Sequence, residues 1–223
     1  MGISRAELAQ IYPRLYHMAE DGTWDSIRRN GLLSTTALLD MYEISGDFRT
    51  TIESEHRPKS VPITHAAYGP AMVRDQKPMS ESALRNCLIE LSPSEWYQLL
   101  NSKVFFWPTY ERLIRLLRGK EYKNRPHCVL TVDTAQLLER HSDRVKLSPY
   151  NSGCTLYNPP KRGKATFLPL EDYPFQERRR KAGGKKNAVA ELTVEYSVPD
   201  IADFTLEVTR MKGEQVIETI FVR

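Results

Sequence analysis

Two kinds of residue in this sequence could do chemistry near the ends of strands: one histidine and a pair of glutamates. His17 lies near the exit of a strand expected at 14–20, beside a turn, where a histidine more often packs or caps than catalyses. Glu191 and Glu195 share the polar face of an alternating strand expected at 188–198. A solvent-exposed strand face is the simpler interpretation of that pattern. The neighbouring segments therefore decide whether these side chains form a site.

The formal net charge is a modest +4, but basic residues cluster in two segments, Arg112–Arg125 and Glu177–Lys186. Leucines in the first segment are spaced as on the buried face of a helix, so its charges could simply face solvent. The second has two glycines and a single apolar residue, which predicts a mobile basic loop suited to phosphates, directly before Glu191. Its candidate nucleic-acid-binding residues are Arg178, Arg179, Arg180, Lys181, Lys185 and Lys186.

The elements that would position these residues indicate a mixed fold. Helices are expected at about 22–30, ending at Gly31, and over STTALLDMYE, SPSEWYQLLN, PTYERLIRLLRG and DTAQLLERH. Strands are expected at 14–20, KVFFW, HCVLTVD, 144–148, 165–168, 188–198, 204–210 and 215–222. The polar segment 45–78 is long for a loop and predicts a lid or ligand-binding loop. This order favours one α+β domain over residues 1–223, with an antiparallel or mixed core.

Composition excludes several classes of protein. With 40% hydrophobic and 27% charged residues in 223, the chain has the composition of a globular protein and not of a disordered or fibrous one. No apolar run approaches the roughly 18 residues of a membrane helix, and charges interrupt the N-terminal segment, so we expect no membrane partner and a cytoplasmic protein. The widely spaced Cys87, Cys128 and Cys154 predict free thiols, with neither a disulfide framework nor a metal site.

A series of short motifs resembles the DarT-type nucleic-acid ADP-ribosyltransferases. The motifs are LYH, SIRRNGLLS, IESEHRPKSVPI, KVFFW and AVAELTVEYSVPDI, in that order along most of the chain. The resemblance implies a compact ADP-ribosyltransferase-like fold with a split, mixed or antiparallel β core, peripheral helices and a cleft for NAD. The function it implies is an NAD-dependent mono-ADP-ribosyltransferase that modifies a base in single-stranded DNA or RNA, as a toxin or phage-defence effector.

The resemblance also implies roles for particular residues. Glu191, Arg57 and His17 would be catalytic. The NAD contacts would be Tyr16, His17, Ser34, Thr35, Arg57 or its competitor Arg49, and the aromatic residues Phe105, Phe106 and Trp107. The family usually has a tyrosine on that aromatic strand, so a hydrogen bond from there would need Tyr110 instead. An aromatic strand is equally common as plain core.

The chemistry of the reaction agrees with these roles. Breaking the bond between nicotinamide and ribose develops a positive charge on the sugar, which a nearby carboxylate stabilises. The same carboxylate can accept the proton of the incoming acceptor. An arginine on the pyrophosphate would hold the part of NAD that does not react.

Two other functions fit parts of the same sequence. An RNA 2′-phosphotransferase-like enzyme would use the same fold and NAD, but its extra phosphate-binding arginines have no match here. A catalytically silent nucleic-acid-binding domain would need only the two basic segments. The sequence leaves open the acceptor, the oligomeric state and whether an antitoxin, such as an ADP-ribosyl hydrolase, is a partner.

Overall fold

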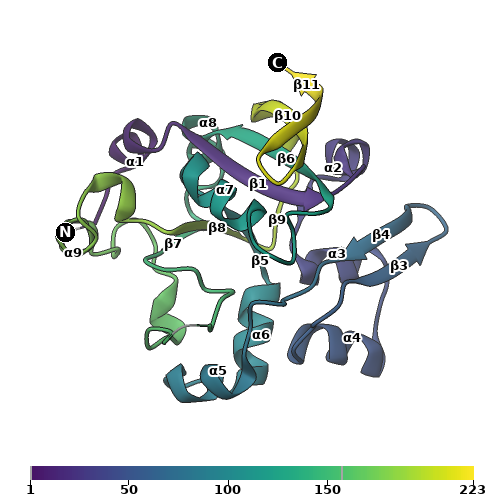
Figure 1. Ribbon diagram of the computed structural model, residues 1–223, viewed down its shortest axis with the longest axis horizontal. Coiled ribbons are helices and arrows are strands. Elements are labelled where there is room, and N and C mark those ends of the chain that lie inside the picture. The colour runs from purple at the N-terminus through teal and green to yellow at the C-terminus, as the bar shows by residue number, and fades with distance from the viewer. Residues whose placement is uncertain (1, 157) are drawn as a thin grey trace.

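A computed structural model describes residues 2–156 and 158–223 and has an α+β fold (Figure 1). Its helices are α1 (Arg5–Ile11), α2 (Trp24–Asn30), α3 (Thr35–Met41), α4 (Gly46–Ser54), α5 (Glu81–Cys87), α6 (Pro93–Asn101), α7 (Tyr110–Leu117), α8 (Thr134–His141) and α9 (Phe175–Lys181). Short 3-10 turns are η1 (Lys164–Thr166), η2 (Lys185–Asn187) and η3 (Ile201–Phe204). The described helices are all too short to cross a bilayer.

Among the described residues, the strands pair antiparallel in four small sheets. They are β1 (Arg14–Glu20), β2 (Leu32–Leu33), β3 (Val61–His65), β4 (Gly69–Val73), β5 (Lys103–Phe106), β6 (Pro126–Asp133), β7 (Val145–Ser148), β8 (Glu191–Glu195), β9 (Ser197–Val198), β10 (Thr205–Lys212) and β11 (Gln215–Val222). The sheet orders are β1-β6-β10-β11, β5-β8-β7, β2-β9 and the hairpin β3-β4. These pairings confirm the expected α+β class with an antiparallel core.

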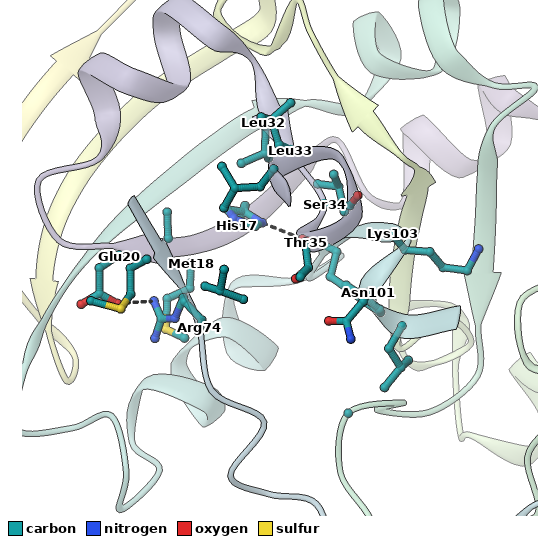
Figure 2. Close-up of a pocket in the computed structure, with 18 of the residues that line it drawn as sticks. His17, Met18, Glu20, Leu32, Leu33, Ser34, Thr35, Arg74, Asn101 and Lys103 are labelled. Carbon is teal, nitrogen blue, oxygen red and sulfur yellow. Dashed lines mark hydrogen bonds and ion pairs between the residues drawn. The ribbon is translucent and has the colours of Figure 1, made fainter. Parts of the chain in front are cut away.

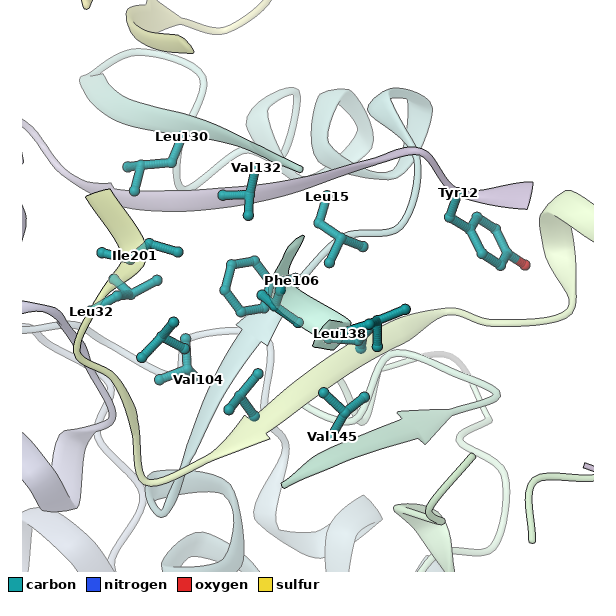
Figure 3. Packing of buried hydrophobic residues seen from close by; sticks show 14 of the residues in the cluster. Tyr12, Leu15, Leu32, Val104, Phe106, Leu130, Val132, Leu138, Val145 and Ile201 are labelled. Carbon is teal, nitrogen blue, oxygen red and sulfur yellow. The ribbon is translucent and has the colours of Figure 1, made fainter. Parts of the chain in front are cut away.

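The two larger sheets meet where β1 passes the end of β5. Tyr16 and Trp107 exchange backbone hydrogen bonds of 2.9 and 2.8 Å there, although the two strands belong to different sheets. The main hydrophobic core fills the space between the sheets. Figure 3 shows the Phe106 ring between Leu15 and Val132 on one side and Val145 on the other. Burial of these side chains locks both sheets into one unit.

Local signals explain the helices that the sequence predicted. Ser92 and Glu95 form the expected capping box at the start of α6, and the Asp133 side chain accepts the Gln136 amide at the start of α8. Gly31 ends α2 with φ of 83°. A Cβ at Gly31 would lie 2.6 Å from the Cα of Pro199, so this glycine also permits a close chain approach.

Several sequence predictions are wrong. The basic segment is not a mobile loop: α9 and η2 cover most of it, because Phe175 is buried and the Arg and Lys residues that follow favour helix. Segment 45–78 contains α4 and the β3-β4 hairpin, and 165–168 is not a strand. The strand expected at 188–198 starts only at Glu191 and breaks at Tyr196, whose φ is 67°. Helices α1 and α5 were not predicted.

Candidate functional site

One cavity of about 390 Å³ collects residues from across the chain. Its lining includes parts of β1, β2, α3, the β3-β4 hairpin, β5 and the start of β8. Figure 2 shows Arg74 next to Glu20 on one side of it and Asn101 on the other, with His17 and Thr35 between. Of the predicted site residues, the cavity brings together His17, Ser34, Thr35, Arg57, Phe105, Trp107 and Glu191. Segments far apart in sequence thus form one concave surface of the size that small ligands use.

His17 is held neutral at the cavity. Its Nδ1 lies 2.8 Å from the carbonyl oxygen of Phe105, so Nδ1 is the protonated nitrogen that donates this bond. Burial lowers the pKa of His17 to about 4, and the positive charge of Arg74 adds to that effect. Nε2 is therefore left as an acceptor for a ligand hydroxyl or N–H group.

Glu191 is a buried carboxylate at the cavity wall. Its side chain is 3% exposed, so the simple interpretation of an exposed strand face is wrong at this position. The backbone N–H of Ser152 lies 3.1 Å from both carboxylate oxygens. Burial raises the pKa of Glu191 to about 7, in spite of the Ser152 hydrogen bond and the charges of Arg162 and Arg112. At neutral pH this group can therefore both accept and release a proton.

The aromatic strand is divided between the cavity and the core. Phe105 and Trp107 line the cavity, whereas Phe106 is 1% exposed and packs in the main core. Side chains alternate along β5, which accounts for this division. Tyr16 points to the other face of its sheet, where its ring lies 5.5 Å from that of Tyr110. Neither tyrosine is among the cavity-lining residues.

Ser34 and Thr35 lie where β2 passes into α3. The Ser34 hydroxyl caps this helix by accepting the Ala37 amide at 3.1 Å, and its own amide donates to the Tyr196 carbonyl. Ser34 is therefore fixed and buried. Thr35 is half-buried and faces the cavity in Figure 2.

The two candidate arginines have different environments. Arg57 lines the cavity but is 7% exposed, and its guanidinium donates to the carbonyls of Arg74 and Ile52 and to the amide oxygen of Asn101. Burial lowers the pKa of Arg57 to about 10, which leaves it charged at neutral pH. Arg49 is not among the cavity-lining residues and pairs with Asp40 and Glu53 at 2.6 and 2.8 Å.

Sequence reasoning missed Arg74, which extends from the end of β4 into the cavity. Its guanidinium lies 3.8 Å from the Glu20 carboxylate and 3.4 Å from Nδ1 of His127. His127 can accept there because its Nε2 donates to the Tyr122 carbonyl at 3.0 Å. Burial lowers the pKa of Arg74, and the negative charge of Glu20 opposes that effect. Arg74 lies within the segment 45–78 that was predicted as a lid or ligand-binding loop, but the hairpin in that segment was not predicted, so no sequence signal singled out this arginine.

The basic residues of α9 and η2 lie outside the cavity lining but next to Glu191 along the chain. Arg179, Arg180 and Lys181 are exposed, whereas Arg178 is half-buried. Lys185 and Lys186 are exposed on η2, whose backbone is tied down because the Tyr12 hydroxyl donates to the Lys185 carbonyl at 2.6 Å. The basic surface is therefore a fixed helix and turn.

The described residues contain no group of three or more His, Cys, Asp or Glu side chains that could hold a metal ion. Cys87 and Cys128 are buried free thiols and Cys154 is a half-buried one, as the spacing predicted.

Fold and site together define an α+β protein with a cavity lined by parts of β1, β2, α3, the β3-β4 hairpin and β5. Besides apolar side chains, this cavity presents a neutral histidine, a buried glutamate and two arginines. The chain belongs to a family of unknown function (DUF7002), whose model matches residues 13–205. All the cavity-lining residues named above lie within that span. A search of curated proteins found none that matches the chain.

Proposed function

We propose that this protein is an NAD-dependent mono-ADP-ribosyltransferase that modifies a base in single-stranded nucleic acid. The observation that carries the proposal is the cavity that joins His17, Arg74 and Glu191 from distant parts of the chain. The order of the motifs and the arrangement of two antiparallel sheets support an ADP-ribosyltransferase-like fold.

Glu191 has the properties that the transfer step requires. As nicotinamide leaves with the electron pair of its bond to ribose, the carboxylate stabilises the positive charge on the sugar. A nitrogen or oxygen of the acceptor then bonds to that carbon, and its proton passes to Glu191. A pKa near 7 suits both roles, because about half of the protein carries the carboxylate form at neutral pH.

Other residues of the cavity lining suit the unreactive part of NAD. His17 presents Nε2 as an acceptor for a ribose hydroxyl, since Nδ1 is occupied by the Phe105 carbonyl. Arg74 is the better pyrophosphate anchor, and Arg57 lies behind it and donates to the Arg74 carbonyl at 2.7 Å. Phe105 and Trp107 offer aromatic surface for stacking.

The basic surface of α9 and η2 suits the phosphates of an acceptor strand. It immediately precedes β8, the strand that begins at Glu191. An unpaired base reaches a reactive sugar at lower cost than a stacked one, which favours a single-stranded acceptor.

The test is transfer of label from NAD, radiolabelled in its adenylate part, to single-stranded DNA, single-stranded RNA and total protein. We expect label in nucleic acid with the wild type and none with Glu191→Gln, which keeps the side-chain shape and loses the carboxylate. Glu139→Gln, on the exposed surface of α8, is the matched control and should transfer normally.

Three outcomes would contradict the proposal in different ways. Label in protein alone would exclude the nucleic-acid acceptor. Loss of phosphate from a 2′-phosphorylated RNA would indicate the phosphotransferase activity instead. A protein that binds oligonucleotides but not NAD would be a silent binding domain.

A further inference from the structure

Arg162 is a large, charged and almost completely buried side chain outside the cavity lining. It is 2% exposed and lies in the loop between β7 and α9. Its backbone is fixed by hydrogen bonds to Cys87 and Ile89, next to α5, at 2.9 and 2.8 Å. Its guanidinium carbon lies 5.8 Å from the ring centre of Trp96 and 5.2 Å from that of Tyr150. The side chain therefore has little freedom to move.

The guanidinium binds the backbone of its own loop. Nη1 donates to the carbonyls of Ser152 and Cys154 at 3.0 and 3.1 Å, and Nε donates to the carbonyl of Pro160 at 3.3 Å. One planar group thus holds three separate peptide units in fixed relation, as only arginine can do. No ion pair within 4.0 Å joins Arg162 to a carboxylate in the part of the chain that the structure describes.

Ser152 connects this arrangement to Glu191. Arg162 binds the carbonyl oxygen of Ser152, and the backbone nitrogen of the same residue lies 3.1 Å from both oxygens of the Glu191 carboxylate. A rotation of the chain at Ser152 would turn that N–H away and deprive the buried carboxylate of a hydrogen-bond donor that contacts both of its oxygens.

We propose that Arg162 is a positioning residue, which fixes the Ser152 backbone so that its N–H holds the Glu191 carboxylate in place. The inference rests on the proposed function for the role of Glu191 in transfer, but the geometry of the three residues does not depend on it.

The charged groups that face Glu191 come from two elements. Arg162 faces it from the loop and Arg112 from α7, and both favour the ionised form. His17, on β1 in the same cavity lining, contributes no charge at neutral pH because burial lowers its pKa to about 4. Loss of Arg162 removes both a positive charge and the support of Ser152, so the ionised form of Glu191 loses two sources of stabilisation.

A role in stability alone does not account for these contacts. Among the described residues, Nη2 of Arg162 is buried without a hydrogen-bond partner. A buried guanidinium with an unpaired nitrogen stabilises a fold less than an apolar side chain of the same volume. The arrangement instead matches the requirement for a carboxylate at a fixed orientation.

The experiment compares the titration of Glu191 in Arg162→Gln, Arg162→Lys and the wild type, by carbon-13 NMR of selectively labelled glutamate. Arg115→Gln, which removes one positive charge from the exposed face of α7, is the matched control. Transfer of label from NAD is measured as a function of pH on the same four proteins.

In Arg162→Gln we expect the Glu191 midpoint to move upward, so that the ionised fraction at pH 7 falls about fivefold. Transfer should fall with it and recover in part at high pH. Arg162→Lys should shift the Glu191 midpoint upward by a smaller amount, because it keeps the charge but a single amine cannot bind all three carbonyls in the same geometry. Arg115→Gln should titrate like the wild type.

A Glu191 midpoint unchanged in both Arg162 variants would overturn the inference. If Arg162→Lys matched the wild type, the effect would be one of charge alone, which also contradicts positioning. Should Arg162→Gln fail to fold, Arg162→Lys retains the charge and the aromatic contacts and decides the result. A wild type that transfers no label would refute the proposed function, while the NMR titration would still test Arg162.

Discussion

Glu191 is a side chain whose surroundings oppose its charge. Burial raises its pKa from 4.5 to about 7, so the folded protein binds a proton there that the unfolded chain has already released at pH 6. The tighter proton binding of the folded state stabilises the fold fully below about pH 4.5. This stabilisation is lost progressively as the pH rises to about 7. At neutral pH and above, the ionised Glu191 carboxylate in its buried position therefore lowers the free energy of unfolding.

Glu191→Gln should remove this dependence. We expect the variant to gain about 3 kcal/mol relative to the wild type between pH 4.5 and pH 7.5, since the neutral amide carries no charge to bury. Urea denaturation of both proteins across that range measures the difference. Parallel stability curves for the two proteins would contradict the raised pKa.

Replacement of Arg74 should mainly affect NAD binding, whereas replacement of Arg57 should mainly affect stability. Arg74→Gln should weaken NAD binding by about tenfold to a hundredfold, because it removes a charge that faces the cavity. Arg57→Gln should mainly lower the melting temperature, because three internal hydrogen bonds are lost. Calorimetric titration with NAD, together with thermal melting, separates the two effects.

Arg49→Gln is the matched control for this pair, since Arg49 forms surface ion pairs away from the cavity lining. It should leave NAD binding unchanged. Full loss of binding in Arg49→Gln, with normal binding in Arg74→Gln, would show that the anchor lies elsewhere.

At the level of elements, the helices whose ends carry strong capping signals could be predicted from the sequence. Helices α1 and α5 were not predicted. Ser92, Asp133 and Gly31 each mark a boundary through a local hydrogen bond or backbone angle, so the sequence alone reveals α6, α8 and α2. The β3-β4 hairpin depends on Ile63 and Val73 packing against α3 and α4, and those contacts are invisible in a local pattern. Arg74 was missed together with that hairpin.

The site was predicted only in part, because local sequence patterns reveal strands but not the tertiary contacts that bury or expose their side chains. His17 and Glu191 lie on strands whose alternation is visible in sequence, although the burial of Glu191 depends on the loop that contains Ser152. Phe106 was assigned to the site but belongs to the core. The motif KVFFW predicted strand β5 correctly. Which side chains of β5 face the cavity depends on the position of β1, which the motif does not reveal.

Gly31 and Gly22 provide a test of the junction between α2 and β2. Both have positive φ, of 83° and 75°, but only at Gly31 would a Cβ meet another segment, the Cα of Pro199 at 2.6 Å. We expect Gly22→Ala to cost about 1 kcal/mol and Gly31→Ala at least about 3 kcal/mol. Equal losses in denaturant titrations would show that the close approach to Pro199 is absent.

Helix α9 should govern the acceptor and leave NAD binding unaffected. Combined replacement of Arg179, Arg180 and Lys181 by glutamine should weaken oligonucleotide binding and flatten its salt dependence, since fewer counterions are released. Arg28→Gln with Arg29→Gln, on the exposed face of α2, is the control. An unchanged salt slope in the α9 variant would remove this helix from the proposed interface.

For the whole molecule, one core cluster joins residues from both ends of the chain. It extends from Ile3 to Val208, and Phe221 packs against it. We therefore expect a single cooperative unfolding transition in calorimetry. NAD at about one hundred times its dissociation constant should raise the melting temperature by roughly 5 to 10 °C. Two separate transitions, only one of which responds to NAD, would contradict a single domain.

The span matched by the family model is a poor guide to where a recombinant fragment should be cut. Trimming the chain to 13–205 would remove Tyr12, whose hydroxyl holds the segment before Glu191, together with all but the first residue of β10 and the whole of β11. Strand β6 would then present an unpaired edge with its neighbouring apolar residues uncovered. Such a fragment should aggregate even though it retains the cavity-lining residues, so activity assays need the complete sheet.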